Sequence, residues 1–130
     1  MKKIIAPIFL ATGLILAACN SHTTERGMTL AQNGQTKLEY TGFNSNTKIL
    51  HASVIQSLNE RRWTVSDSGN PIKAEIKHGG QHAIVAITVF DDKISIDTKG
   101  SYIETDGHYV PLRYIDYLVA STRKNLKATK

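Results

Sequence analysis

Two histidines four positions apart are the first candidates for chemistry in this 130-residue chain. His78 and His82 enclose Gly79, Gly80 and Gln81. Two imidazoles at this spacing could ligate one metal ion or act as an acid and a base. The two glycines also tolerate the positive φ angles that a tight hairpin turn requires. The choice between a metal site and a turn therefore depends on the elements that carry the histidines.

The residues on both sides of Gly79 and Gly80 predict a β-hairpin. The two flanking segments, 72–78 and 82–90, are rich in β-branched side chains, which favour strands. If the two glycines form the turn, successive side chains alternate between the faces of the hairpin, and the two histidines lie on opposite faces. We therefore expect no shared metal site, and we expect no cofactor.

A second predicted turn, Asp91-Asp92, supports the same strand register. It pairs Val89 with Ile94 and continues one apolar face onto residues 93–99. A shift of one residue would move the whole apolar set to the other face. Two turns that give one apolar face therefore predict an antiparallel meander, and this face needs a helical layer to cover it.

Two helices can supply that layer. Residues 44–63 place apolar side chains at helical spacing, with Ser45, Asn46 or Thr47 as the N-cap. Residues 111–128 form the clearest amphipathic pattern in the chain.

Short strands are expected at 36–42 and 63–66. We predict one α+β domain over residues 36–130, a four- to five-stranded antiparallel meander with two helices packed on one face.

The first eighteen residues predict export. Lys2 and Lys3 precede a largely apolar stretch that is too short for a convincing membrane span. The residues Leu16-Ala17-Ala18-Cys19 follow directly, and Cys19 is the single cysteine of the chain.

This stretch resembles the lipobox of bacterial lipoproteins. The resemblance implies that signal peptidase II removes residues 1–18 and that Cys19 becomes the lipidated first residue. Asn20 follows in place of an aspartate, which in enterobacterial lipoproteins favours the inner membrane. If the source is Gram-negative, we therefore expect a lipid-anchored protein of the outer membrane that faces the periplasm.

The polar composition of residues 19–35 predicts a lipidated N-terminus and a flexible tether between the anchor and the domain. Without Lys2 and Lys3 the formal net charge falls from +5 to +3. This mild charge and the predicted export argue against nucleic acid as a partner.

The outer face of the predicted sheet is the first candidate interaction surface. An apolar stripe on its middle strand is flanked by lysines, with acidic residues interspersed, and such a surface could bind a protein, an acidic glycan or a lipid headgroup. The N-terminal segment or the lysine stems could instead cover it. The surface comprises Lys73, Lys77, Ile84, Thr88, Phe90, Lys93 and Lys99.

The neighbourhood of Tyr109, Arg113 and His108 is the alternative site. Tyrosine and arginine are common in binding hot spots. No sequence motif orders a nucleophile, a base and a carboxylate, so no catalytic residue is assigned. We expect a non-catalytic envelope module that binds an envelope protein or polymer. A small periplasmic hydrolase or ligand-binding protein remains the alternative.

Overall fold

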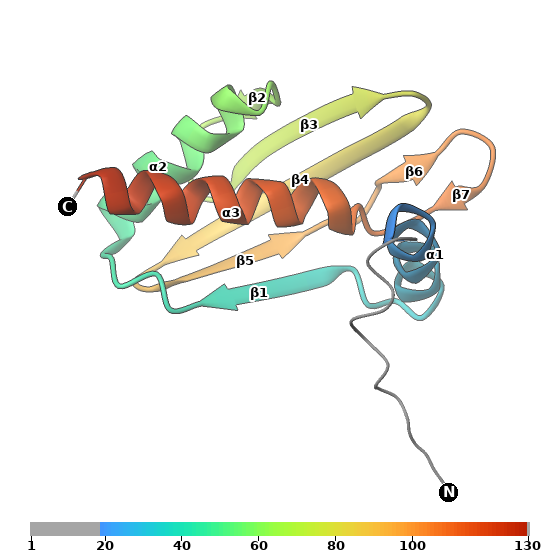
Figure 1. Cartoon of the computed structure of the whole chain (residues 1–130), viewed down its shortest axis with the longest axis horizontal. Helices are drawn as coiled ribbons and strands as arrows, with labels where there is room; N and C mark the ends of the chain where they lie inside the picture. The colour runs from blue at the N-terminus through green and yellow to red at the C-terminus, as the bar shows by residue number, and fades with distance from the viewer. Residues whose placement is uncertain (1–18, 130) are drawn as a thin grey trace, which may run out of the picture.

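The computed structural model describes residues 19–129 and the side chains of residues 23–128. The predicted signal peptide, residues 1–18, lies outside the described residues. Within residues 19–129, three helices and seven strands follow one another (Figure 1). They are α1 (Cys19–Gln32), β1 (Lys37–Thr41), α2 (Thr47–Glu60), β2 (Thr64–Asp67), β3 (Ile72–His78), β4 (Gln81–Phe90), β5 (Lys93–Asp97), β6 (Tyr102–Ile103), β7 (Gly107–His108) and α3 (Leu112–Thr129).

The sheet confirms the predicted α+β fold. The strands β2, β3, β4 and β5 form an antiparallel meander, and β1 returns to pair with β5 at the edge, in the order β1-β5-β4-β3-β2. The glycine turn pairs His78 with Gln81, as predicted. The Asp91-Asp92 turn pairs Val89 with Ile94.

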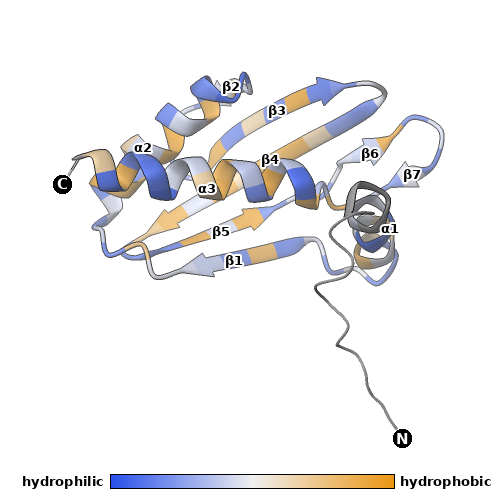
Figure 2. Cartoon of the chain, in the orientation of Figure 1, coloured by the Kyte–Doolittle hydropathy of each residue, from blue (hydrophilic) through white to orange (hydrophobic). Residues whose placement is uncertain are grey.

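The apolar face of the sheet packs against α2 and α3, which lie on one side of it (Figure 1). Hydrophobic and hydrophilic residues alternate along the strands and recur along α3 (Figure 2), as the burial of one face requires. Asn46 caps α2 with its side chain, which accepts a hydrogen bond from the Ile49 amide. Several core side chains have no exposed surface, among them Leu50, Val54, Leu58, Ile72, Ile87, Ile94, Ile96, Ile115 and Leu118.

The Asp91-Asp92 turn also holds the loop that leads into α2. Asp91 accepts hydrogen bonds from the amide and the hydroxyl of Thr47, at 2.8 and 2.7 Å. Asp92 accepts from the amides of Gly42 and Asn44. The two carboxylates therefore join β4 and β5 to the start of α2, and the Thr47 bonds lower the pKa of Asp91.

The segment predicted as a flexible tether is instead helical from Cys19 to Gln32. At the middle of α1 the Val110 amide donates a 2.9 Å hydrogen bond to the Gly27 carbonyl. A Cβ atom at position 27 would overlap the Val110 carbonyl oxygen, so glycine permits this close approach. The prediction failed because a weakly amphipathic helix has little local signal, and α1 is stabilised by a contact with residues far along the chain.

The short strands β6 and β7 extend the sheet beyond the predicted meander. β6 pairs with the first two residues of β4, on the edge of β4 that β5 occupies further along. Ser101 bridges the gap between β5 and β6. Its hydroxyl accepts a 2.8 Å hydrogen bond from the Ile84 amide and donates a 2.9 Å bond to the Ile84 carbonyl.

Candidate functional site

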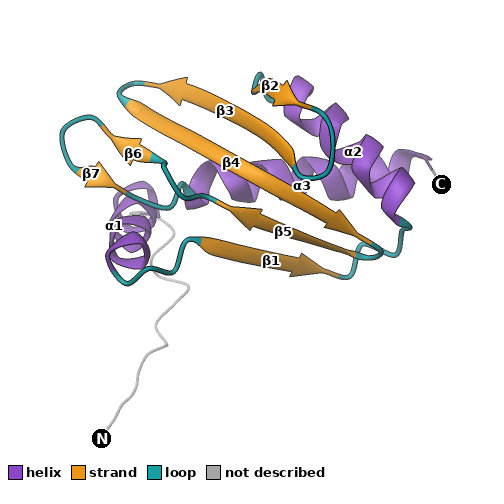
Figure 3. Ribbon diagram, turned by 180° about the vertical axis from the view of Figure 1, so that it is seen from behind, coloured by secondary structure: helices purple, strands orange, loops and turns teal. Residues whose placement is uncertain are grey.

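The outer face of the sheet is turned away from α2 and α3. Figure 3 shows β3, β4 and β5 from this side, with both helices behind them. Because the register is as predicted, the seven residues of the predicted surface lie on this face or at its rim. Lys73, Lys77 and Lys99 are exposed, whereas Ile84 and Thr88 are half-buried.

A shallow hollow of about 440 Å³ lies on one part of this face. Ile84 and Ala86 lie on the middle strand, where the small side chain of Ala86 leaves space. Lysines and carboxylates of both neighbouring strands surround the two residues. The charged lining residues are Lys73, Glu75, Asp97 and Lys99. The hollow thus contains three of the seven residues predicted from the sequence, namely Lys73, Ile84 and Lys99.

Phe90 and Lys93 lie outside the hollow, at the far end of the same face. The Phe90 side chain is 44% exposed. The Lys93 Nζ atom lies 4.9 Å from the centre of the Phe90 ring, within the range of a cation–π contact. This end presents an aromatic ring and a cation beside the Asp91-Asp92 turn, so only part of the predicted surface lies in the hollow.

The opposite end of the face contains a histidine–carboxylate pair. The His82 Nε2 atom lies 2.8 Å from Glu104 Oε2, and the imidazole stacks on the Tyr102 ring with centroids 4.3 Å apart. The hydrogen bond with His82 lowers the pKa of Glu104. In the described part of the chain, no serine, threonine or cysteine side chain forms a hydrogen bond with His82 that could activate it as a nucleophile.

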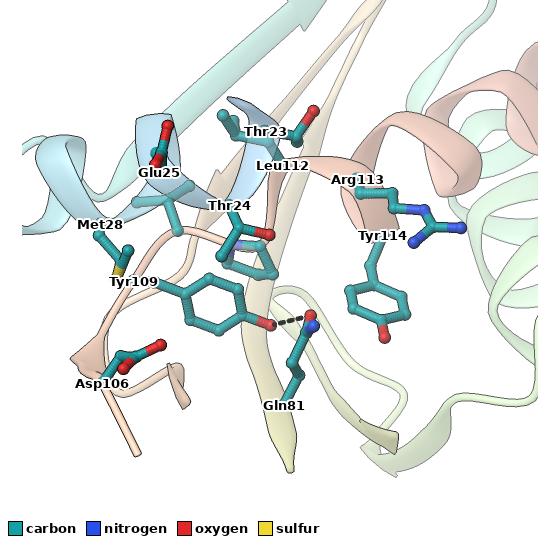
Figure 4. A pocket seen from close by; sticks show the side chains of 12 residues that line it. Thr23, Thr24, Glu25, Met28, Gln81, Asp106, Tyr109, Leu112, Arg113 and Tyr114 are labelled. Atoms are coloured by element: carbon teal, nitrogen blue, oxygen red, sulfur yellow. Dashed lines mark hydrogen bonds between the residues drawn. The ribbon is translucent and has the colours of Figure 1, made fainter. Parts of the chain in front are cut away.

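A separate pocket of about 400 Å³ lies between α1, the start of β4 and the start of α3 (Figure 4). Tyr109 forms part of its wall, and its hydroxyl donates a 3.3 Å hydrogen bond to Gln81 Oε1. Met28 and Thr24 enter from α1, and Arg113 and Tyr114 from α3. The segment predicted as a tether therefore supplies one wall of the pocket.

The pocket combines two of the three residues of the alternative site. Tyr109 and Arg113 line it, whereas His108 is exposed on β7 and is not among the lining residues. Burial raises the pKa of Tyr109, with a smaller contribution from Tyr114, so the phenol stays protonated at physiological pH. A neutral phenol and an amide can position a polar ligand, and the carboxylates of Glu25 and Asp106 also line the pocket.

Two groups in these sites were not anticipated from the sequence. Glu104 belongs to no motif in the sequence, and it pairs with His82 because β6 joins the edge of β4. Met28 and the threonines of α1 were assigned to the tether. An isolated glycine in a helical segment, Gly27, was the one local signal of a close helix contact.

The part of the chain from residue 19 to 129 contains no group of three histidine, cysteine or carboxylate side chains placed to hold a metal ion. Within the same residues, no helix combines the length and the hydrophobicity needed to cross a membrane. Comparison with known proteins finds no matching family model, no similar curated sequence and no similar solved structure.

Proposed function

We propose that the chain is a lipid-anchored, non-catalytic binding module of the bacterial cell envelope. Cys19, in the lipobox-like stretch Leu16-Ala17-Ala18-Cys19, is the proposed site of lipid attachment. Two or three acyl chains bind a protein to a bilayer durably, whereas one chain binds it marginally. For a Gram-negative source, we propose the outer membrane, facing the periplasm, as its location, because Asn20 stands where an aspartate would favour inner-membrane retention.

The observation that supports a binding role is the hollowed outer face of the sheet. Its lining alternates in charge, with Lys73 beside Glu75 on β3, and Asp97 and Lys99 on the other side. A polymer of uniform negative charge would favour lysines alone, because each carboxylate would repel it. A protein segment that carries both charges suits the alternating lining better. We therefore favour an envelope protein over an envelope polymer as the partner.

Site-specific photo-crosslinking tests this binding role. A photoreactive amino acid at Thr88, on the outer face, should form a discrete covalent adduct in intact cells. The same amino acid at Ala120, which is exposed on α3, is the matched control and should not form that adduct. Lys73→Glu should reduce the Thr88 adduct, because it reverses a charge in the hollow. Adducts of equal yield at both positions would contradict the proposal.

The anchor has an independent test. Cys19→Ala should leave a product that is uncleaved or released from the membrane, and intact-mass measurement of the unaltered protein should show acyl chains on an N-terminal Cys19. An unlipidated mature form that begins at another residue would refute the anchor and leave the binding role of the outer face untouched.

The pocket supports a second candidate function, that of a small-ligand-binding protein. Its volume lies within the range of small-molecule sites, and Tyr109, Gln81 and Arg113 provide polar groups around an apolar wall. A Tyr109→Phe variant, which removes only the hydroxyl, should then lose the ligand-induced rise in melting temperature in a screen of periplasmic metabolites. A screen without any such rise for the unaltered protein would remove this candidate.

A further inference from the structure

The strand β1 is an open edge of the sheet. Its one strand partner among the described residues is β5, and Figure 1 shows it as the outermost strand. An open edge leaves backbone amides and carbonyls free to pair with another strand, and β1 carries Lys37 and Glu39 as its exposed charges.

The hydrogen bonds of the ladder show which groups of β1 are free. The Thr98 amide donates to the Thr36 carbonyl at 2.9 Å, so Thr36 faces β5. In an antiparallel ladder the bonded positions alternate, and therefore Leu38 and Tyr40 also face β5 with their backbone groups. The amides and carbonyls of Lys37, Glu39 and Thr41 point to the open edge.

Arg123 occupies one of these open positions. Its Nη2 atom donates a 3.1 Å hydrogen bond to the Thr41 carbonyl, and its guanidinium lies 4.3 Å from the centre of the Phe43 ring. The Thr41 carbonyl is thus engaged within the same chain. The free part of the edge is limited to the backbone groups of Lys37 and Glu39 and the amide of Thr41.

We propose that β1 pairs in antiparallel fashion with β1 of a second copy of this chain, in the register that places Leu38 opposite Leu38 of the second copy. In this register Lys37 of each copy lies opposite Glu39 of the other. The backbone groups of Lys37 and Glu39 in the two copies then form four hydrogen bonds. The side chains of the same residues form two opposite-charge pairs on the outer face.

The neighbouring registers conflict with the structure. A register centred on Glu39 would place two carboxylates opposite each other and would require the Thr41 carbonyl to accept from Lys37 of the other copy. Arg123 already uses that carbonyl. The Arg123 contact and the charges therefore both exclude the register centred on Glu39. The charges alone exclude a register centred on Lys37, because it would place two lysines opposite each other.

Disulfide trapping tests the dimer and its register together. At the proposed centre the two Leu38 Cα atoms lie at a non-hydrogen-bonded pair, about 4.5 Å apart, which a disulfide can span. Leu38→Cys in the full chain should therefore give a covalent dimer under mild oxidation. Thr41→Cys is the control on the same strand, because its two copies would lie about 20 Å apart along the strand direction.

The unaltered chain, whose single cysteine is Cys19, is run beside both variants to identify any disulfide formed by that residue. A pairing of two short strands buries less surface than a stable interface of about 1,200 Å², so the dimer is expected to be weak and to need the trap. Circular dichroism of each variant checks its fold.

Charge reversal in the Leu38→Cys background supplies a second readout. Lys37→Glu or Glu39→Lys alone creates two like-charge pairs and should lower the dimer yield about fivefold. The double variant exchanges the charges, restores both opposite-charge pairs and should recover the yield. Equal yields from Leu38→Cys and Thr41→Cys would overturn the proposal, as would a double variant no better than the single ones. In either case Lys37 would instead prevent the open edge of β1 from pairing with another strand.

Discussion

Gly27 is the residue on which the position of α1 depends. The absence of a side chain allows the Gly27 carbonyl to accept the Val110 amide, and α1 thereby packs beside the segment that leads into α3. A methyl group here would meet backbone atoms, which cannot move aside as the end of a flexible side chain can.

Gly27→Ala should therefore separate α1 from the domain despite the higher helix propensity of alanine. We expect a loss of about 1–3 kcal/mol in the free energy of unfolding, the usual cost of an overpacked contact. Urea titration measures this loss, and amide hydrogen exchange should show faster exchange across residues 23–32. Thr29→Ala, at an exposed position of the same helix, is the control and should change neither quantity.

Asp91 makes the stability of the domain depend on pH in the acid range. Its hydrogen bonds with Thr47 hold its pKa in the folded chain below the value of about 3.9 in the unfolded chain. Unfolding therefore takes up a proton at acidic pH. The stabilising contribution of Asp91 is present above about pH 4 and is lost as the pH falls through the lower folded-state pKa.

Asp91→Asn should reduce this dependence, because the amide keeps an acceptor oxygen but cannot titrate. We expect a smaller drop in melting temperature between pH 5 and pH 3 for the variant than for the unaltered chain. Asp106→Asn replaces an exposed carboxylate for which no hydrogen bond to the described residues is found, and it should leave the dependence unchanged. Parallel curves for all three proteins would contradict this role of Asp91.

At the scale of elements, Ser101 lets β5 and β6 act as one interrupted strand beside β4. The Ser101 hydroxyl forms hydrogen bonds with both the amide and the carbonyl of Ile84, which lies at the gap between β5 and β6. Buried or half-buried backbone groups without partners are costly, so this single hydroxyl maintains the continuity of the edge.

Ser101→Ala should destabilise the domain by about 1–3 kcal/mol, because the Ile84 amide and carbonyl lose their partner away from bulk water. Denaturant unfolding measures the change. Ser95→Ala on β5 is the control, since the Ser95 side chain forms no hydrogen bond with the described residues. A Ser101→Ala change within 0.5 kcal/mol of the Ser95→Ala change, the usual range for surface substitutions, would show that water replaces the hydroxyl.

At the scale of the whole molecule, α2, α3 and the sheet share one core. Leu118 of α3 has no exposed surface, and the single tryptophan, Trp63, is 5% exposed between α2 and β2. We expect the domain to unfold as one cooperative unit, so that tryptophan fluorescence and far-ultraviolet circular dichroism give the same transition.

Leu118→Ala should lower the free energy of unfolding by about 2–5 kcal/mol, the range for a large-to-small change in a core. Both probes should shift together to lower denaturant concentration. Ala120→Gly, on the exposed face of the same helix, should cost about 1 kcal/mol through helix propensity alone. Separate transitions for the two probes would show that the helices and the sheet unfold independently.

The docked α1 also changes the geometry of the proposed membrane anchor. A flexible tether over the sixteen residues 20–35 would average roughly 20–24 Å between its ends. The helix instead begins at Cys19 and contacts the domain at Gly27, eight positions further on. A lipid on Cys19 would therefore hold the pocket beside α1 near the bilayer surface.

The sequence alone determined the meander, its register and the composition of the outer face. Period-two patterning and two short turns are local signals, and the registers set by the two turns place the same apolar residues on one face. The seven residues of the predicted surface therefore occupy the predicted face. The lipobox resemblance is equally local, and it stays a prediction because its residues precede or begin the described part of the chain.

Tertiary structure decided the features that join distant residues. The contact of Gly27 with Val110 makes α1 part of the domain, and the pairing of β6 with β4 brings Glu104 to His82. The return of β1 to β5 leaves Lys37 and Glu39 on an open edge. None of these contacts leaves a mark on the local sequence pattern of the segments that form them. Each contact is stabilised by the packing of surfaces that meet only when the whole chain is folded.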